Sequence, residues 1–335
     1  MTLVDAHQRP LRDLRISVTD RCNFRCTYCM PREHFGPEHA FLERRELLTY
    51  EEICTVVAAL LPTGLEKVRL TGGEPLLRID LIEFIRMLRA LAPKIDLAMT
   101  TNGVLLQKQA SALAQAGLDR VTVSLDALDK ATFQTMSDTD AFQPDDILIG
   151  IDAALKAGLK VKVNTVVRKG LNEHQIVPIA QACIEREIPL RFIEFMDVGT
   201  TNAWDLSEVV SGEEIRSIIT TNIGPLTPLA GQSKSEVARR YHTENGQEFG
   251  FINSVTEPFC GSCTRARLSA NGSLYTCLFA SEGHDVKSLI RMGASEADVQ
   301  NAVRSIWNRR EDTYSLERAQ SQDAKPKVEM SFIGG

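Results

Sequence analysis

Two groups of three cysteines have residue types and spacings that could do chemistry. Cys22, Cys26 and Cys29 form a C-x3-C-x2-C run, and Cys260, Cys263 and Cys277 form a C-x2-C-x13-C run. Thiolates suit zinc, cuprous copper or iron–sulfur clusters, whereas a closed structural zinc site takes four protein ligands. Three cysteines on a four-iron cluster would leave one iron open. Each group therefore predicts a cluster at which a substrate or cosubstrate can bind.

Zinc is the alternative for both groups. His34 could complete a Cys3His site after Cys29, and His284 could do the same for the second group. The aromatic Tyr28, beside the last cysteine of the first group, has no explanation in a zinc site. The other cysteines, Cys54 and Cys183, lie in apolar helical patterns and are expected to be buried small hydrophobic residues.

The bulk composition is that of an ordinary globular protein. Its 335 residues are 43% hydrophobic and 24% charged, and the net charge of −6 argues against a broad nucleic-acid surface. No apolar run approaches the roughly 20 residues that span a bilayer, and no secretion signal is evident at the N-terminus. Eight cysteines without such a signal favour a reducing compartment. We expect a cytoplasmic protein that binds neither nucleic acid nor membrane.

Strand-like and helix-like segments alternate along the first two thirds of the chain. The strand candidates are residues 14–19, 67–70, 96–100, 120–125, 160–166 and 190–195. Helices are expected to begin at Thr49, Asp80 and Asn172, each followed three residues later by Glu or Gln, and a further helix is expected over 295–307. Six β-then-α units predict an α/β fold, a partial (β/α)6 TIM-like barrel over residues 10–225. A C-terminal region over 226–335 follows a Pro/Gly-rich boundary.

The predicted strands have one polar and one apolar face, because side chains alternate across a strand. The polar face carries Arg15, Ser17, Thr19, Arg69, Thr71, Thr100, Asn102, Thr122, Ser124, Asp126, Lys162 and Asn164. A filled barrel has an interior of branched apolar residues, so these residues predict a lumen that holds a polar ligand. The sixth strand is ambiguous: Arg191, Ile193 and Phe195 lie on one face, and Phe192, Glu194 and Met196 on the other.

A glycine-rich turn follows the second predicted strand. The sequence Thr71-Gly72-Gly73-Glu74-Pro75 lets the backbone approach a ligand closely. Together with the first cysteine group, this turn resembles the GGE motif of the radical S-adenosylmethionine (SAM) superfamily. In that superfamily the open iron chelates the amino and carboxylate groups of SAM, and the GGE motif contacts the amino group. The resemblance implies that SAM binds at the first cluster.

The second cysteine group narrows this resemblance. The chain is similar to the GTP 3′,8-cyclase family of molybdenum cofactor biosynthesis over about residues 10–335. The matching segments are Arg15-x-Ser17, the 71–75 turn, Thr100-Thr101-Asn102-Gly103, Val123-Ser124-Leu125-Asp126, Lys162-Val163-Asn164, residues 192–196, residues 260–268 and the final Gly334-Gly335. A SPASM-type extension, common in peptide-modifying radical enzymes, would need more cysteines than the chain has left.

The resemblance implies roles for individual residues. Cys22, Cys26 and Cys29 would hold the SAM cluster, and Cys260, Cys263 and Cys277 a second cluster whose open iron meets the guanine. Tyr28, Gly73, Ser124 and Met196 would contact SAM; Arg15, Arg69, Thr100, Lys162, Arg265 and Arg267 would contact GTP, with Arg15, Arg265 and Arg267 also in catalytic roles. Gly334-Gly335 would reach toward the active site. Independently, a cationic pocket in an acidic chain suits a polyanion, since guanidinium groups bind phosphate bidentately. Parity cannot separate Lys160 from Lys162; the Lys-Val-Asn match favours Lys162.

The resemblance also implies a reaction. The enzyme would be a lyase that converts GTP to (8S)-3′,8-cyclo-7,8-dihydroguanosine 5′-triphosphate, using a 5′-deoxyadenosyl radical to remove hydrogen from C3′. Its cofactors would be two [4Fe-4S] clusters and SAM. Its partners would be an external one-electron donor, a second copy in a homodimer, and a downstream cyclic pyranopterin monophosphate synthase. The alternatives are a two-cluster radical SAM enzyme acting on a peptide, and a non-catalytic, zinc-stabilised nucleotide-binding protein.

Overall fold

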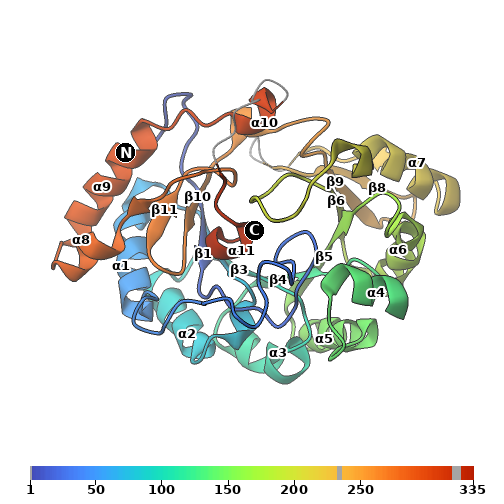
Figure 1. The fold of residues 1–335 in the computed structure, drawn as a ribbon, viewed down its shortest axis with the longest axis horizontal. Helices are drawn as coiled ribbons and strands as arrows, with labels where there is room; N and C mark the ends of the chain where they lie inside the picture. Colours follow the sequence, from blue (N-terminus) through green and yellow to red (C-terminus); the bar gives the residue numbers. More distant parts are fainter. Residues whose placement is uncertain (1, 232–235, 319–325) are drawn as a thin grey trace.

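A computed structural model describes residues 2–231, 236–318 and 326–335. Strands and helices alternate through the first part of the chain (Figure 1). The strands are β1 (Asp13–Ser17), β2 (Lys67–Thr71), β3 (Asp96–Thr101), β4 (Arg120–Ser124), β5 (Lys160–Val167) and β6 (Leu190–Glu194). The helices are α1 (Tyr50–Leu60), α2 (Leu81–Leu91), α3 (Leu106–Gln115), α4 (Lys130–Ser137), α5 (Pro144–Lys156), α6 (Ile176–Glu185) and α7 (Gly212–Asn222). All six predicted strands are confirmed, with ends that differ by one or two residues.

The C-terminal part contributes shorter elements. They are β7 (Thr227–Pro228), β8 (Arg239–His242), β9 (Glu248–Ile252), β10 (Arg265–Leu268), β11 (Ser273–Tyr275), β12 (His284–Asp285), α8 (Lys287–Arg291), α9 (Glu296–Asn308), α10 (Tyr314–Glu317) and α11 (Met330–Ile333). One sheet contains all these strands in the order β12-β11-β10-β1-β2-β3-β4-β5-β6-β9-β8-β7. Strands β1 to β6 are parallel neighbours, which confirms the partial barrel. β10 pairs parallel with β1, and β9 pairs parallel with β6, so the C-terminal part extends both edges.

The predicted helix starts have different outcomes. Thr49 forms a complete capping box with Glu52 at α1, and Ser295 does the same with Asp298 at α9. Asp80 precedes α2 but has a left-handed backbone and makes no capping bond. The Asn172 side chain turns instead toward the barrel, where it donates to the carbonyls of Asp126 at 2.9 Å and Val166 at 2.8 Å. A 3-10 turn therefore precedes α6.

The two faces of the strands separate as the alternation predicts. The apolar residues of β1 to β5, such as Ile16, Val68 and Val121, are fully buried in the core beneath the helices. On the opposite face, Arg69 Nη1 donates to the hydroxyls of Thr100 and Thr122, both at 3.1 Å, and so spans three strands across the lumen. The polar lumen is thus confirmed.

The register also settles the sixth strand. Arg191 pairs with Asn164 of β5 and with Gly250 of β9, and paired residues of parallel strands point to the same face. Arg191 therefore faces the lumen. Glu194 lies on the outer face, where it accepts a hydrogen bond from the Gly212 amide at 2.8 Å.

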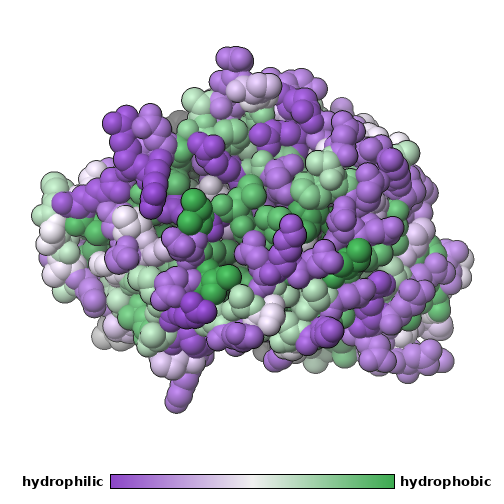
Figure 2. All heavy atoms as spheres, turned by 90° about the horizontal axis from the view of Figure 1, so that it is seen from below, coloured by the Kyte–Doolittle hydropathy of each residue, from purple (hydrophilic) through white to green (hydrophobic). Residues whose placement is uncertain are grey.

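One face of the molecule carries both polar and apolar side chains. Hydrophilic side chains cover much of the face seen in Figure 2, and apolar side chains show between them. Within the described part of the chain, no helix is long and apolar enough to cross a membrane. Of the two cysteines outside the groups, Cys183 is buried in the core, as predicted, whereas Cys54 is only partly buried against the core.

Candidate functional site

The first cysteine group lies in the loop that follows β1, at the end of the sheet where the parallel strands finish. The Arg25 guanidinium holds this loop together, because it donates to the carbonyls of Cys22 at 2.9 Å and Phe35 at 2.7 Å. Asn102, just after β3, donates to the Asn23 side chain at 2.8 Å. The loop is therefore tied to the end of the barrel before any ligand binds.

The Gly72-Gly73-Glu74 turn packs directly against this loop. The Gly73 amide donates to the Thr19 carbonyl, and the Glu74 amide to the Arg21 carbonyl, both at 2.8 Å. A Cβ atom on Gly73 would lie 2.3 Å from the Arg21 oxygen, a distance that real Cβ atoms do not show. The glycines are thus needed where two backbones meet. The buried Glu74 carboxylate accepts from the Thr101 hydroxyl and the Asn102 amide, each at 2.8 Å.

Some of the residues predicted to contact SAM gather beside this loop. Tyr28 and Ser124 line one small cavity together with Cys26, Asn102 and Asp126. The Tyr28 hydroxyl donates to Asp126 at 2.7 Å, and burial raises the pKa of Asp126 to about 6. Gly73 lies in the adjoining turn. Met196 follows β6 and does not line this cavity; its carbonyl accepts from the Asn202 amide group at 3.0 Å.

The three thiols of the first group are close enough to influence one another. Burial, with the charge of Glu74, raises the pKa of Cys22 to about 12. Burial also raises the pKa values of Cys26 and Cys29, and for these two thiols the neighbouring cysteines add to the effect. Thiols of this kind are ligands whose protons a metal centre must displace. Among the described residues, no three His, Cys, Asp or Glu side chains converge on one metal-ion position.

The two kinds of metal site place different demands on their ligands. One zinc ion draws all its thiolates to about 2.3 Å from a single centre, whereas the cysteines of a four-iron cluster bind different irons and stand further apart. His34 and His284, the proposed fourth zinc ligands, are both exposed. Neither histidine is therefore a buried fourth ligand for its cysteine group.

Arginines from three adjacent strands form a cationic row in the lumen. Arg15 of β1 pairs in register with Arg69 of β2 on one side and with Arg267 of β10 on the other. Burial and neighbouring arginines lower the pKa values of Arg69 and Arg267 to about 10. Arg265 pairs in register with Asp13, the acidic residue beside this row. This crowding of buried cations creates a site for an anion.

Unsatisfied polar atoms support that conclusion. Within the described residues, the Nε atoms of Arg15 and Arg191 and the Oδ1 atom of Asn164 are buried without a hydrogen-bond partner. Buried polar atoms are normally paired, so these three point to a ligand in the lumen. Gly250 makes room for Arg191, since a Cβ atom there would lie 3.0 Å from the Arg191 Cγ atom.

The structure distinguishes the two candidate lysines. Lys160, at the start of β5, is exposed, whereas Lys162 is half-buried. Burial and the positive charge of Arg191 lower the pKa of Lys162 to about 8. Thr100 also faces the lumen, where its hydroxyl accepts a hydrogen bond from Arg69. Lys162 is therefore the lysine of the cationic lumen.

The second cysteine group lies at the edge of this row. The 3-10 turn Cys260–Ser262 leads through Cys263 directly into β10. Burial raises the pKa of the Cys263 thiol, but the charges of Arg265 and Arg310 outweigh burial and lower that pKa to about 6. Burial raises the pKa of Cys277 to about 11. Arg265 and Arg267 thus adjoin this group, since both interact electrostatically with Cys263 and Cys277.

The C-terminal residues enter the lumen. In Figure 1 the C-terminus lies inside the ring of helices, next to α11 and β1. The Gly334 carbonyl accepts from Arg267 Nη1, and a Cβ atom on Gly334 would clash with the Thr71 hydroxyl. Glu329 anchors this segment, because its carboxylate accepts from the amide and hydroxyl of Thr200 and from the Thr201 hydroxyl, all at 2.9 Å.

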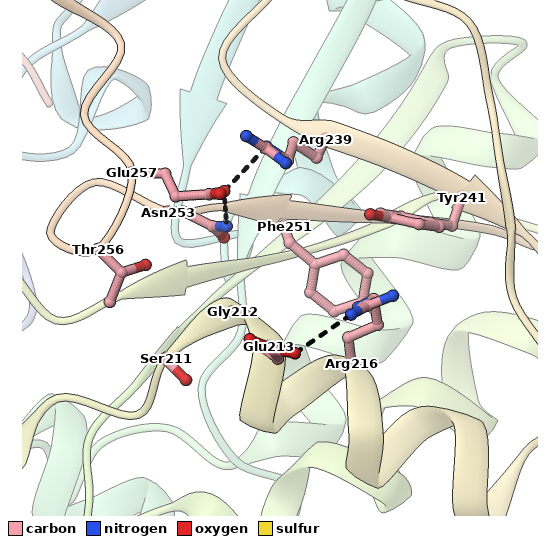
Figure 3. Close-up of a pocket in the computed structure, with 10 residues that line it drawn as sticks. All are labelled: Ser211, Gly212, Glu213, Arg216, Arg239, Tyr241, Phe251, Asn253, Thr256 and Glu257. Atoms are coloured by element: carbon pink, nitrogen blue, oxygen red, sulfur yellow. Dashed lines mark hydrogen bonds and ion pairs between the residues drawn. The ribbon is translucent and has the colours of Figure 1, made fainter.

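A larger cavity of about 380 Å³ lies elsewhere, between α7 and strands β8 and β9 (Figure 3). None of the predicted site residues lines it. Its two arginines are already paired, Arg239 with Glu257 at 2.9 Å and Arg216 with Glu213 at 3.7 Å. Its lining includes Phe251, on the face of the sheet opposite the lumen, so it is separate from the cationic site.

Comparisons with known proteins agree with the geometry. Residues 16–183 match the Radical SAM superfamily, and residues 188–316 match the family described as Molybdenum Cofactor Synthesis C. The GTP 3′,8-cyclase of Acidothermus cellulolyticus is 48% identical, with 99% of this chain and 98% of that protein aligned. The chain belongs to the GTP 3′,8-cyclase family. The GTP 3′,8-cyclase of Staphylococcus saprophyticus is 46% identical, with 99% of each chain covered.

Solved structures support the fold of this family member. Streptococcus suis SuiB bound to S-adenosylmethionine has a TM-score of 0.62 at 15% identity, covering 94% of this chain and 69% of SuiB. SuiB has also been solved with its precursor peptide SuiA, but a likeness at this identity concerns the fold alone. The family relatives favour neither the peptide alternative nor the zinc alternative. The predicted domain boundary at 225 stays a prediction; the two family matches meet between residues 183 and 188.

Two parts of the site are not predicted by local sequence patterns. Alternation along the sixth strand does not decide the direction of Arg191, although Gly250 opposite it in β9 is a signal that a large side chain needs room there. The anchor formed by Glu329 with Thr200 and Thr201 has no sequence signal, because it joins residues 128 or 129 positions apart.

Proposed function

We propose that this chain catalyses the radical SAM cyclisation of GTP to (8S)-3′,8-cyclo-7,8-dihydroguanosine 5′-triphosphate, the first step of molybdenum cofactor biosynthesis. The observation that carries the proposal is the row Arg267–Arg15–Arg69 in a lumen, with one three-cysteine group in the loop after β1 and the other beside β10. A nucleoside triphosphate matches the cations. When bound, the first cluster and SAM supply a 5′-deoxyadenosyl radical, which is the chemistry of the cofactor.

We assign the metal and SAM contacts as follows. Cys22, Cys26 and Cys29 would hold the first cluster, and Cys260, Cys263 and Cys277 the second. Tyr28, Gly73, Ser124 and Met196 would contact SAM. The support for this assignment is the cavity shared by Tyr28, Ser124 and Cys26 and the packing of the Gly73 turn on the cysteine loop.

The cationic residues would orient GTP. We assign Arg15, Arg69, Thr100, Lys162, Arg265 and Arg267 to substrate binding, with Arg15, Arg265 and Arg267 also acting on the reacting nucleotide. Their guanidinium groups would fix the triphosphate bidentately. A fixed triphosphate holds C3′ and C8 in one orientation, and such positioning is worth several kcal/mol of activation free energy.

The overall change at GTP balances in three parts. A hydrogen atom would leave C3′ for 5′-deoxyadenosine, a bond forms between C3′ and C8, and one electron with one proton completes the product, which is an isomer of GTP. We infer that an external one-electron donor supplies this electron and also the one that the cleavage of SAM to methionine requires. The Gly334-Gly335 segment, which contacts Arg267, would help to exclude water from the lumen. We further propose a homodimer in the cytoplasm and transfer of the product to cyclic pyranopterin monophosphate synthase.

Isotope transfer tests this proposal. The reconstituted chain is incubated anaerobically with SAM, dithionite and GTP that carries deuterium at C3′. We expect one deuterium in the 5′-deoxyadenosine formed and none in the cyclised nucleotide, and we expect SAM cleavage to require GTP.

GTP with deuterium at C2′ is the matched control, and it should transfer no deuterium. Recovery of unreacted GTP, with SAM cleavage that is the same with and without GTP, would show that GTP is not the substrate. Transfer from C2′ would instead show that the site of hydrogen removal is wrong.

A further inference from the structure

A buried charged cluster lies directly behind the second cysteine group and has no part in the function proposed above. It consists of Asp5, Arg9 and Arg310, whose exposed fractions are 2%, 2% and 4%. These residues come from the N-terminal segment before β1 and from the segment after α9. Three ionised side chains buried together are rare unless they are paired and have a function that requires charge.

The geometry of the cluster is directed at the cysteines. The Asp5 carboxylate pairs with Arg9 Nε at 2.6 Å and with Arg310 Nη1 at 3.2 Å, and so holds both guanidinium groups. Arg9 Nη1 donates to the Cys260 carbonyl at 2.8 Å, and Arg310 Nη1 donates to the Cys263 carbonyl at 2.8 Å. Both ends of the Cys260–Cys263 turn are thus held from behind.

The turn has little support of its own. Its internal backbone bonds are long, 3.2 Å from the Cys263 amide to the Cys260 carbonyl and 3.4 Å from the Ser262 amide to the Phe259 carbonyl. A buried ion pair contributes little to net stability, and apolar residues of the same size often serve a fold as well. Apolar residues could not, however, donate hydrogen bonds to the two carbonyls of this turn.

The first cysteine group shows the same pattern with different residues. There Arg25 donates to the Cys22 carbonyl at 2.9 Å and to the Phe24 carbonyl at 2.8 Å. Each cysteine loop is therefore held by arginine through the carbonyl of its leading cysteine. Outer contacts of this kind orient metal ligands before the metal arrives.

We propose that Asp5, Arg9 and Arg310 are positioning residues that hold Cys260 and Cys263 in the arrangement that takes up the second cluster. The inference rests on the assignment of Cys260, Cys263 and Cys277 to that cluster in the proposed function. It concerns cluster assembly, so it predicts selective loss of the second cluster whether or not GTP is turned over.

Iron content measures this selectivity. The full chain should hold about eight iron per chain after anaerobic reconstitution, and Asp5→Asn, Arg9→Lys or Arg310→Lys should reduce this about twofold, to about four. Lysine cannot make the forked contact to a carboxylate and a carbonyl that arginine makes. The first cluster should persist, seen as an unchanged shift of its electron paramagnetic resonance (EPR) signal on adding SAM.

Arg89→Lys is the matched control. Arg89 also pairs with an aspartate, Asp119, at 2.7 Å and donates to carbonyls, those of Gly117 and Ile95, but it lies near neither cysteine group. This variant should keep about eight iron.

A chain without the first cysteine group tests the second iron–sulfur cluster by itself. With Cys22, Cys26 and Cys29 all changed to Ala, the chain should hold about four iron, and adding Arg9→Lys should remove at least three quarters of it. Full iron content in the Arg9 and Arg310 variants would overturn the proposal. Equal loss of iron from both cysteine groups in every variant would also overturn it. The charged residues Asp5, Arg9 and Arg310 would then support the whole fold rather than one metal site. Neither result depends on GTP turnover, which tests the proposed function separately.

Discussion

Raising the pH from about 7 to about 9 is expected to weaken GTP binding through one side chain, Lys162. Burial of its ammonium group, together with the positive charge of Arg191, lowers its pKa to about 8. The group is therefore a cation below about pH 8 and becomes neutral as the pH rises through that value. The phosphates of GTP are already ionised over this range, since their last pKa lies near 6.

The size of the effect follows from linkage. Bound triphosphate stabilises the ammonium form, so the pKa of Lys162 is higher in the complex than in the free protein, and binding takes up a proton as the pH rises. With a free-protein pKa of about 8, the Kd should rise about tenfold between pH 7 and pH 9. The upper limit is the strength of one charge-assisted hydrogen bond, about 1.5–3 kcal/mol, or roughly tenfold to hundredfold in Kd.

Equilibrium binding of GTP under anaerobic conditions, without SAM, measures this directly. Lys162→Arg should bind GTP with nearly constant Kd over the same range, because arginine stays charged. Lys160→Arg is the matched control, since Lys160 is exposed on the same strand, and it should keep the tenfold dependence of the native chain. A tenfold change that survives in Lys162→Arg, or that disappears in Lys160→Arg, would refute the reasoning.

Three further changes test other parts of the site. Gly73→Ala should destabilise the turn by about 1–3 kcal/mol, since its Cβ atom meets the Arg21 oxygen, and should lower iron content at the first group. Arg191→Ala should raise the pKa of Lys162, by removing a neighbouring cation, and should move the inflection in GTP binding to higher pH. Glu329→Gln should loosen the C-terminal segment by about 1–2 kcal/mol, seen as faster hydrogen exchange in residues 326–335.

Matched variants define what would contradict these expectations. Gly261→Ala adds a Cβ atom into open space. If Gly261→Ala loses as much iron as Gly73→Ala does, steric contact of the added Cβ atom is not the cause of the iron loss. If the pH of the inflection in GTP binding is the same in Arg191→Ala as in the native chain, the charge of Arg191 does not lower the pKa of Lys162. For the C-terminal segment, the exposed Glu244 changed to Gln should have no effect on exchange, and equal exchange in both variants would show that Glu329 is no anchor.

The barrel could be predicted because each βα unit carries its own local signals. Strands rich in β-branched residues alternate with helical segments, and the inward positions of Arg15 and Arg69 follow from parity alone. The capping box at Thr49 formed because both partners lie within one turn. Information of this kind is local, so it needs no knowledge of distant contacts.

The features that the sequence does not predict depend on contacts between segments that are distant along the chain. Asn172 has a helix-start pattern, but its side chain bonds the carbonyls at the ends of two neighbouring segments instead. Arg191 was ambiguous because the sixth strand is charged and apolar on both faces, and only its pairing with Asn164 decides its direction. The Asp5–Arg9–Arg310 cluster joins segments about 300 residues apart, a separation that no local pattern reports.

The strands that flank the six-stranded barrel, β10 and β9, explain why an acidic chain can hold a cationic lumen. The second cysteine group leads directly into β10, and β10 places Arg267 beside Arg15. The arginine row is therefore completed by the same segment that carries Cys260 and Cys263. On the other flank of the barrel, β9 supplies Gly250 and leaves space for Arg191. Buried cations without an anion oppose folding. A bound triphosphate and thiolate-held clusters would therefore offset the electrostatic repulsion between the buried arginines of the lumen. Substrate and cluster binding should accordingly stabilise the same C-terminal strands, because both sites share them.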